Sequence, residues 1–282
     1  MVLSGLVLAV VFAARGDSGF GLGGRIAVLT IDGIITDDME LLEQIRDFRR
    51  DATIRGFVVA INSPGGIVGP SQSIYHELRR LREDGRPVIA SIGAVGASGG
   101  YYVALGADSI YAMPGSLTGS IGVIMEFPDA SQLMEKVGIR MQAVKSAEHK
   151  DIGSPFRPIT PGDSAILGAL VQDVYQQFVD VVATERNLDR AAVQAIADGR
   201  ILSGRQALEG RLIDRLGNFE DALAAAGRMA GLGDRPRITR PPEDEFTLWH
   251  VLMGRGIEGV LGRLVEPLEK ASVPNVKLMI PW

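Results

Sequence analysis

A single serine, Ser98, lies among four glycines in residues 92–102, which read Ile-Gly-Ala-Val-Gly-Ala-Ser-Gly-Gly-Tyr-Tyr. Glycine permits a sharp turn and a close approach of the backbone. A helix that begins just after the serine would offer free N–H groups. A nucleophilic serine needs this combination of an accessible hydroxyl and nearby oxyanion donors. The same residues also suit an ordinary strand-to-helix turn in which Ser98 caps the helix.

A serine nucleophile needs a base, and the lysines are the candidates. The chain has 29 Lys and Arg residues, of which only five are lysines, and Lys136, Lys145 and Lys150 lie close together in sequence. Arginine keeps its proton, whereas a desolvated lysine can lose it. The reference pKa of lysine is about 10.4. To lower it to near 7, the site must destabilise the charged form relative to the neutral form by about 4 to 5 kcal/mol. His149 is the only histidine near these lysines and is interpreted as a surface neighbour.

Composition excludes several classes of function. The chain has 282 residues, 46% of them hydrophobic, which suffices for one large domain or two small ones. Its net charge of −5 argues against nucleic acid as the main partner. It has no cysteine, which excludes disulfides and thiolate chemistry, and its three scattered histidines argue against a metal site.

The elements that would position Ser98 follow from the hydrophobic pattern. Amphipathic helices are predicted at 38–50 and 71–83, between short apolar strands at 26–31, 56–61, 88–92 and 109–113. Strands that alternate with helices indicate βαβ units and a parallel sheet. Glycine-rich turns follow two of these strands, at Gly65 and at Ser98. Because the carboxyl ends of parallel strands share one crevice, we expect the two turns to meet.

The second half of the chain reads as mainly helical. A long amphipathic helix is predicted at 162–186, with its apolar stripe at Ile166, Leu170, Val174, Phe178 and Val181. The other predictions are helices at 130–137, 189–197, 203–209 and 219–229, a strand at 140–144, a linker at 235–245, a helical tail at 246–269 and an apolar end at 276–282.

The N-terminal segment resembles part of a signal sequence or membrane anchor. Residues 2–14 are apolar, and a glycine-rich linker follows at 16–24. The predicted organisation is an anchor and linker at 1–24, a catalytic domain at 25–232, and a linker with an amphipathic tail at 233–282.

Four motifs together resemble the signal peptide peptidase A (SppA) family of membrane-bound serine peptidases, in its short single-domain form. In order along residues 26–230 they are Asn-Ser-Pro-Gly-Gly at 62–66, the Ser98 stretch at 93–102, Thr-Gly-Ser-Ile-Gly-Val at 118–123 and the run at 145–155 that contains Lys-Asp-Ile-Gly-Ser-Pro. The resemblance implies an α/β fold of the ClpP/crotonase-like class, a spiral of βαβ units with additional helices.

The resemblance also implies a Ser-Lys dyad. By position, Ser98 is the nucleophile, Lys150 is the general base, Gly66 and Gly99 supply oxyanion N–H groups, and Ser120 orients the lysine amine. No cofactor or metal is implied. The expected function is a membrane-associated serine endopeptidase that degrades cleaved signal peptides or other small apolar peptides.

Lys145 is the competing base, and Lys150 is preferred because its context matches the family motif. Nothing in the order of elements forces Ser98 and Lys150 together within one subunit. The related family builds its site at a junction between catalytic domains, which for this chain predicts a homo-oligomeric ring with shared sites. We expect a cell-membrane location with one N-terminal anchor and an extracytoplasmic catalytic domain.

Two other functions fit parts of the pattern. A crotonase-like acyl-CoA enzyme would use the glycine N–H groups to polarise a thioester, with a glutamate such as Glu126 as base. A non-catalytic membrane scaffold would use the glycines only for close packing.

Overall fold

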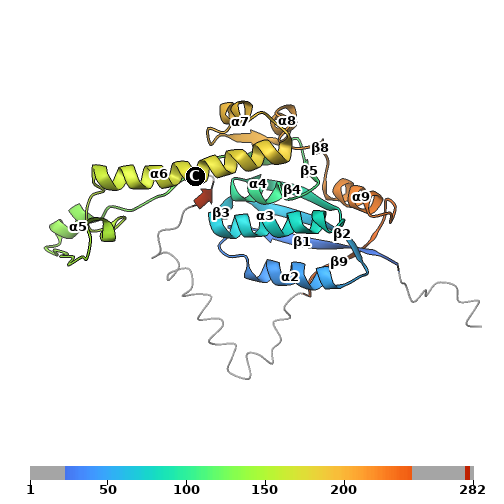
Figure 1. Cartoon of the computed structure of the whole chain (residues 1–282), viewed down its shortest axis with the longest axis horizontal. Coiled ribbons are helices and arrows are strands. Elements are labelled where there is room, and N and C mark those ends of the chain that lie inside the picture. Colours follow the sequence, from blue (N-terminus) through green and yellow to red (C-terminus); the bar gives the residue numbers. More distant parts are fainter. Residues whose placement is uncertain (1–22, 243–276, 280–282) are drawn as a thin grey trace, which may run out of the picture.

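The computed structural model of the chain describes residues 23–242 and 277–279 (Figure 1). The predicted anchor at residues 2–14 and the predicted helical tail at 246–269 lie outside the described residues. Among the helices within the described ranges, none is both long enough and apolar enough to cross a membrane. The domain boundaries stay a prediction.

An eight-stranded, mostly parallel sheet forms the centre of the molecule, in the order β7-β6-β4-β2-β1-β9, with β5 pairing with β4 and with β8. The eight strands of this sheet are β1 (Arg25–Asp32), β2 (Ile54–Ser63), β4 (Val88–Ala97), β5 (Ser109–Ala112), β6 (Leu117–Gly119), β7 (Ile201–Ser203), β8 (Arg215–Leu216) and β9 (Arg237–Thr239). Two further short strands, β3 (Gly65–Ile67) and β10 (Lys277–Met279), form a separate two-stranded sheet. The expected α/β fold is confirmed.

Helices cover both faces of this sheet. The helices of the described residues are α2 (Met39–Arg50), α3 (Val68–Glu83), α4 (Gly99–Ala104), α5 (Ser131–Lys136), the 3₁₀ turn η1 (Glu148–Asp151), α6 (Pro161–Arg186), α7 (Arg190–Ile196), α8 (Gly204–Glu209) and α9 (Phe219–Met229). On one face, α2, α3, α4 and the second half of α6 pack together and bury Leu78 and Phe178. On the opposite face, α9 buries Ala222 and Ala226 against Val58.

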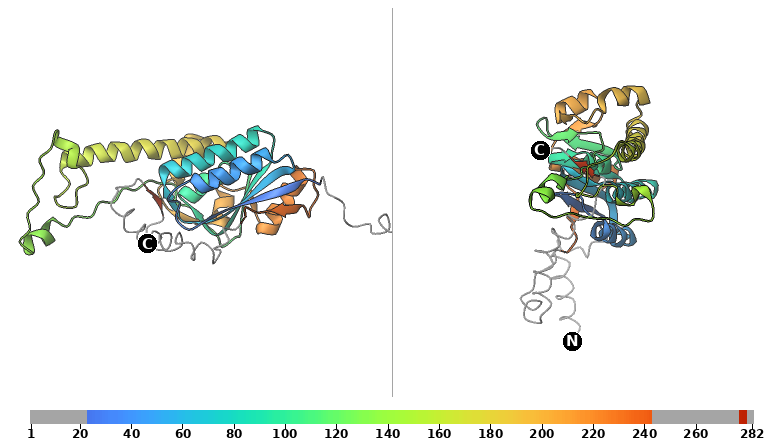
Figure 2. Two further views of the ribbon diagram at one scale, coloured as in Figure 1. Left: turned by 90° about the horizontal axis from the view of Figure 1, so that it is seen from below. Right: turned by 90° about the vertical axis from the view of Figure 1, so that its left-hand side faces the viewer.

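The helix α6 is longer than the body that it packs on. Its 26 residues begin at a capping box formed by Thr160 and Asp163, with Pro161 in the first turn. Figures 1 and 2 show its first half reaching beyond the sheet, with α5 and the neighbouring loops at its far end. We call residues 126–170 the arm. The predicted apolar stripe is therefore buried only in part, because Ile166 and Leu170 are exposed and Phe178 is buried.

The C-terminal end of α6 is fixed to the body by buried polar contacts. Glu185, with a side chain only 9% exposed, lies 2.9 Å from Arg82 and accepts a hydrogen bond of 2.6 Å from the Tyr75 hydroxyl. The next residue, Arg186, pairs with Asp214 at 2.8 Å. These contacts set the direction in which the arm leaves the body.

Three local predictions differ from the structure. Residues 140–144 form no strand, because they lie in the arm without a neighbouring strand to pair with. The linker at 235–245 contains β9, which pairs with β1 in parallel. Ser203, predicted as the first residue of the helix at 203–209, is instead the last residue of β7, which pairs antiparallel with β6. In each case pairing partners distant in the sequence decide the outcome.

Candidate active site

Ser98 lies on a strained turn between β4 and α4. Its backbone angles are φ 53° and ψ −117°, a region that residues other than glycine rarely adopt. The turn is held by the Ser98 amide, which donates to the Gly119 carbonyl at 2.8 Å. The side chain is fully buried, and among the described residues its Oγ has no hydrogen-bond partner. A strained strand-to-helix turn with an unpaired serine hydroxyl matches the turn that carries a serine nucleophile.

The two predicted oxyanion glycines lie together beside Ser98. A Cβ on Gly99 would lie 3.0 Å from the Gly66 nitrogen, and a Cβ on Gly66 would lie 2.0 Å from the Ile35 carbonyl oxygen. Only glycine fits such contacts. Gly99 is the first residue of α4, where backbone N–H groups are free to bind an anion. The prediction that the two glycine-rich turns meet in space is confirmed.

The strand β3 that contains Gly66 carries a second strand along its edge. Residues of β10 pair with it antiparallel, with Leu278 opposite Gly66. Figure 2 shows this short strand at the base of the arm. The edge beside Gly66 thus accepts an extended peptide segment.

Ser120 belongs to the same part of the molecule as Ser98. It follows Gly119, whose carbonyl accepts a hydrogen bond from the Ser98 amide. Ser120 is only 3% exposed and has a positive φ of 50°. Ser120 borders a pocket of about 440 Å³, whose other lining residues include Val123, Val171 and Tyr175. The structure therefore brings together Ser98, the two glycines and Ser120.

Lys150 lies elsewhere, in η1 at the far end of the arm, and is exposed. Its neighbour His149 contacts Asp163, in the first turn of α6, at 3.0 Å. Further along the same helix, Phe178 packs on Tyr102, which follows Ser98 by one helical turn. From Asp163 to Phe178, a rise of about 1.5 Å per residue gives about 22 Å. Within one chain, the structure does not bring Lys150 to Ser98 or to Ser120.

The competing base Lys145 is engaged in other contacts. Its Nζ donates to the Glu148 carbonyl at 2.8 Å and to Asp151 at 2.7 Å. These contacts hold the Lys145 amine at the tip of the arm, beside Asp151. Glu126, the base of the acyl-CoA alternative, is exposed at the start of the arm.

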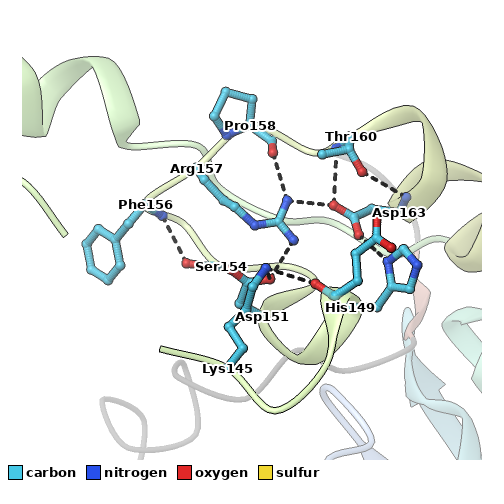
Figure 3. A network of polar contacts seen from close by, with 10 residues as sticks. Lys145, His149, Asp151, Ser154, Phe156, Arg157, Pro158, Thr160 and Asp163 are labelled. Carbon is cyan, nitrogen blue, oxygen red and sulfur yellow. Dashed lines mark hydrogen bonds and ion pairs between the residues drawn. The ribbon is translucent and has the colours of Figure 1, made fainter. Parts of the chain in front are cut away.

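A group of charged residues at the tip of the arm was missed from the sequence. Arg157 contacts Asp151 and Asp163, and Asp163 also contacts His149 (Figure 3). These contacts hold the pKa of both carboxyls well below their usual range. The run Thr-Pro-Gly-Asp at 160–163 carries the signal of a capping box, which would have marked Asp163 as a fixed residue. No group of metal-binding side chains occurs in the ranges 23–242 and 277–279.

Comparison with known proteins gives one family. Residues 80–233 match peptidase family S49. The chain is 49% identical over 175 residues to a Synechocystis protein named as a protease, and these residues cover 62% of this chain and 63% of that protein. It is 34% identical over 223 residues to an Enterococcus faecium protein named as a signal peptide peptidase SppA, and these residues cover 74% of this chain and 65% of that protein.

A further relative is longer. Protease 4 of Salmonella typhi is 34% identical over 219 residues, which cover 74% of this chain and 35% of that protein. The chain thus spans less than two thirds of the length of these relatives. The matched region includes Ser98, Gly99, Ser120 and Lys150. The chain belongs to peptidase family S49, the family of the SppA serine peptidases.

Proposed function

We propose that this chain is a serine endopeptidase in which Ser98 is the nucleophile and Lys150 the general base. The observation that carries the proposal is the turn at Ser98. A strained backbone, a free hydroxyl and the adjacent Gly66 and Gly99 amides suit attack on a carbonyl carbon.

The proposed reaction is acyl transfer in two steps. The Ser98 hydroxyl attacks the peptide carbonyl and gives its proton to the neutral Lys150 amine. The ammonium then protonates the leaving amine as the C–N bond breaks, and water hydrolyses the acyl-enzyme by the reverse proton path. The Gly66 and Gly99 amides would stabilise the oxyanion in both steps, while Ser120 would orient the lysine amine.

The edge of β3 supports a peptide as the substrate. An extended substrate can pair with the edge of a strand through main-chain hydrogen bonds. The strand β10 pairs with this edge opposite Gly66, and a substrate strand would take its place. A peptide bound in this way would pass the Ser98 hydroxyl with its carbonyl groups near the glycine amides.

We further propose that Lys150 reaches Ser98 from a neighbouring copy of the chain. Within one chain the arm holds Lys150 about 22 Å along α6 from the Tyr102–Phe178 contact. The arm exposes apolar side chains that a second copy could bury, among them Leu133, Met141 and Val144. A ring in which each arm reaches the next subunit would complete every site.

The proposed substrates are cleaved signal peptides and other small apolar peptides. The name of the Enterococcus faecium relative supports this class. An attachment to the cell membrane through residues 2–14, with the catalytic domain on the extracytoplasmic side, fits the same proposal.

A serine-reactive phosphonate with an apolar peptide side chain tests the proposed nucleophile. We expect a covalent adduct, located by peptide mass mapping at Ser98, together with loss of cleavage of a signal-peptide-like substrate. Ser98→Ala should take no label, and the buried Ser91→Ala in β4 should label like the unsubstituted protein. An adduct on another serine, or cleavage by Ser98→Ala, would overturn the proposal. A crotonase-like enzyme or a scaffold would take no label.

A further inference from the structure

The two chain neighbours of Lys150, His149 and Asp151, belong to a closed ring of contacts at the tip of the arm (Figure 3). Arg157 donates from Nη2 to Asp151 Oδ1 at 2.8 Å and from Nη1 to Asp163 Oδ2 at 2.6 Å. His149 Nδ1 lies 3.0 Å from the other oxygen of Asp163. Both chain neighbours of Lys150 are therefore tied to one α6 carboxylate, directly or through Arg157. The Lys150 side chain takes part in none of these contacts.

The ring is attached to a rigid element. The Asp163 side chain is only 2% exposed. Its Oδ2 accepts the Thr160 amide at 3.2 Å, while the Asp163 amide donates to Thr160 Oγ1 at 3.1 Å. The Asp163 side chain cannot turn away without breaking one half of the α6 capping box. The ring thus fixes η1 relative to the axis of α6.

The ring also occupies the carboxylate nearest to Lys150 in the chain. Asp151 Oδ1 accepts from Arg157 at 2.8 Å and from Lys145 at 2.7 Å. A free carboxylate beside Lys150 would favour its ammonium form. A general base must instead be neutral, so a carboxylate that is already paired with two cations suits that role.

We propose that Arg157 is a positioning residue for Lys150: it holds η1 on the first turn of α6 and keeps the Asp151 carboxylate paired. The inference rests on the proposed role of Lys150 as general base. Two carboxylates on different elements call for a planar, forked donor. Lysine offers only a point charge in the same place.

Removal of Arg157 should change both the rate and its pH dependence. The titratable groups around the turn are Lys145, Glu148, His149, Asp151, Arg157 and Asp163. Without the guanidinium, one positive charge is lost and Asp151 is freed in part. Both changes favour the Lys150 ammonium, so the acid limb of the kcat profile should move to higher pH.

The test compares kcat, KM and the pH profile of full-length variants on one signal-peptide-like fluorogenic substrate. For Arg157→Ala we expect kcat at neutral pH to fall by about 10- to 100-fold, the effect of a misplaced reacting group. KM should change by less than about 2-fold, because the peptide binds at β3. Arg157→Lys should recover part of kcat. Adding Asp151→Asn to Arg157→Ala should return the acid limb toward its original pH.

Two controls separate this inference from the proposed function. Arg140→Ala removes an exposed arginine of the same arm and should leave every parameter unchanged. Lys150→Ala should be inactive. If Lys150→Ala retained full activity, the proposed function would fail. If Lys150→Ala were inactive but Arg157→Ala kept the original kcat and pH profile, only the positioning role would fail.

Hydrogen–deuterium exchange gives a readout that does not depend on activity. In Arg157→Ala, the amides of residues 147–154 should exchange faster, while those of β1 and β2 keep their protection. An unchanged rate at 147–154 would contradict the inference. Should Arg157→Ala disturb assembly, Arg157→Lys retains the charge and is expected to show the same changes in smaller measure. Loss of kcat in Arg157→Ala with an unmoved acid limb would indicate a structural role only.

Discussion

Phe178 packs against Tyr102 with their ring centroids 4.9 Å apart, which joins the long helix α6 to the helix that begins at Ser98. The contact fixes one end of α6 close to the predicted nucleophile. Because the predicted base lies beyond the other end of the same helix, the two groups are held apart by a rigid rod. This separation motivates our proposal that a reaction using both takes place between two chains.

Mixing two inactive variants tests this requirement. Ser98→Ala and Lys150→Ala are each expected to lack activity, and mixed oligomers should recover part of it, since some junctions pair an intact Ser98 with an intact Lys150. The measurement is peptide cleavage after subunit exchange, with mixed oligomers verified by native mass spectrometry. Verified mixed oligomers that stay inactive would show that each site forms within one chain.

Two substitutions of Ser98 should separate catalysis from backbone strain. Both Ser98→Ala and Ser98→Gly should reduce kcat by more than about 1000-fold, because the nucleophile is lost. Only glycine relieves the strain at φ 53°, which is of order 1 kcal/mol or more. Ser98→Gly should therefore melt about 2 to 4 °C above Ser98→Ala in calorimetry. Equal melting temperatures would mean that the turn stores no strain.

Replacement of Lys150 by arginine should abolish activity as completely as replacement by alanine. Arginine retains the charge and the length but cannot accept a proton at working pH. Cleavage assays between about pH 6 and 10 provide the measurement, and Lys136→Arg in α5 is the matched control. Substantial cleavage by Lys150→Arg would leave Lys150 with an electrostatic role only.

Two glycines three residues apart should respond in opposite ways to alanine. A Cβ on Gly66 would lie 2.0 Å from the Ile35 oxygen, whereas a Cβ on Gly69 meets nothing within 4 Å. We expect Gly66→Ala to lose more than about 2 kcal/mol of unfolding free energy. Gly69→Ala in α3 should be neutral or up to about 1 kcal/mol more stable. Denaturant titration measures both, and similar values would contradict the contact at Ile35.

Acid should loosen the tip of the arm before the body. The pKa values of Asp151 and Asp163 are lowered in the fold by Arg157 and their other partners. Their ion pairs therefore stabilise the tip of the arm above the unfolded carboxyl pKa of about 3.9, and this stabilisation is lost as the pH falls below that value. Hydrogen exchange at residues 147–163, corrected for the intrinsic effect of pH, should rise below about pH 4. Asp163→Asn should show fast exchange already at neutral pH.

The sequence predicted the body of the fold well because its signals are local. Apolar strands such as 88–92 and the helices at 71–83 and 219–229 have strong periodicity and clear ends, so their types follow from short windows. The meeting of Gly65 and Ser98 also followed, because the carboxyl ends of parallel strands share an edge.

The arm and the short strands could not be predicted in the same way. The apolar stripe of α6 runs without interruption from Ile166 to Phe178. No local signal in the sequence shows that the helix leaves the body of the protein between these two residues. The strands β9 and β10 depend on partners far away in the sequence. The ring around Arg157 depends on side-chain geometry across three segments, which spacing alone does not give.

The attachment of α6 through Glu185 and Arg186 makes the helix a lever with its pivot in the body. Over the roughly 33 Å of helix between Glu185 and Asp163, a tilt of about 2° at the pivot moves the tip by about 1 Å. An error of that size in the position of a reacting group can reduce a rate by about 100-fold. Under the proposed shared site, the angular stiffness of a few ion pairs, far from either reacting atom, would set how accurately one subunit delivers its lysine to the next.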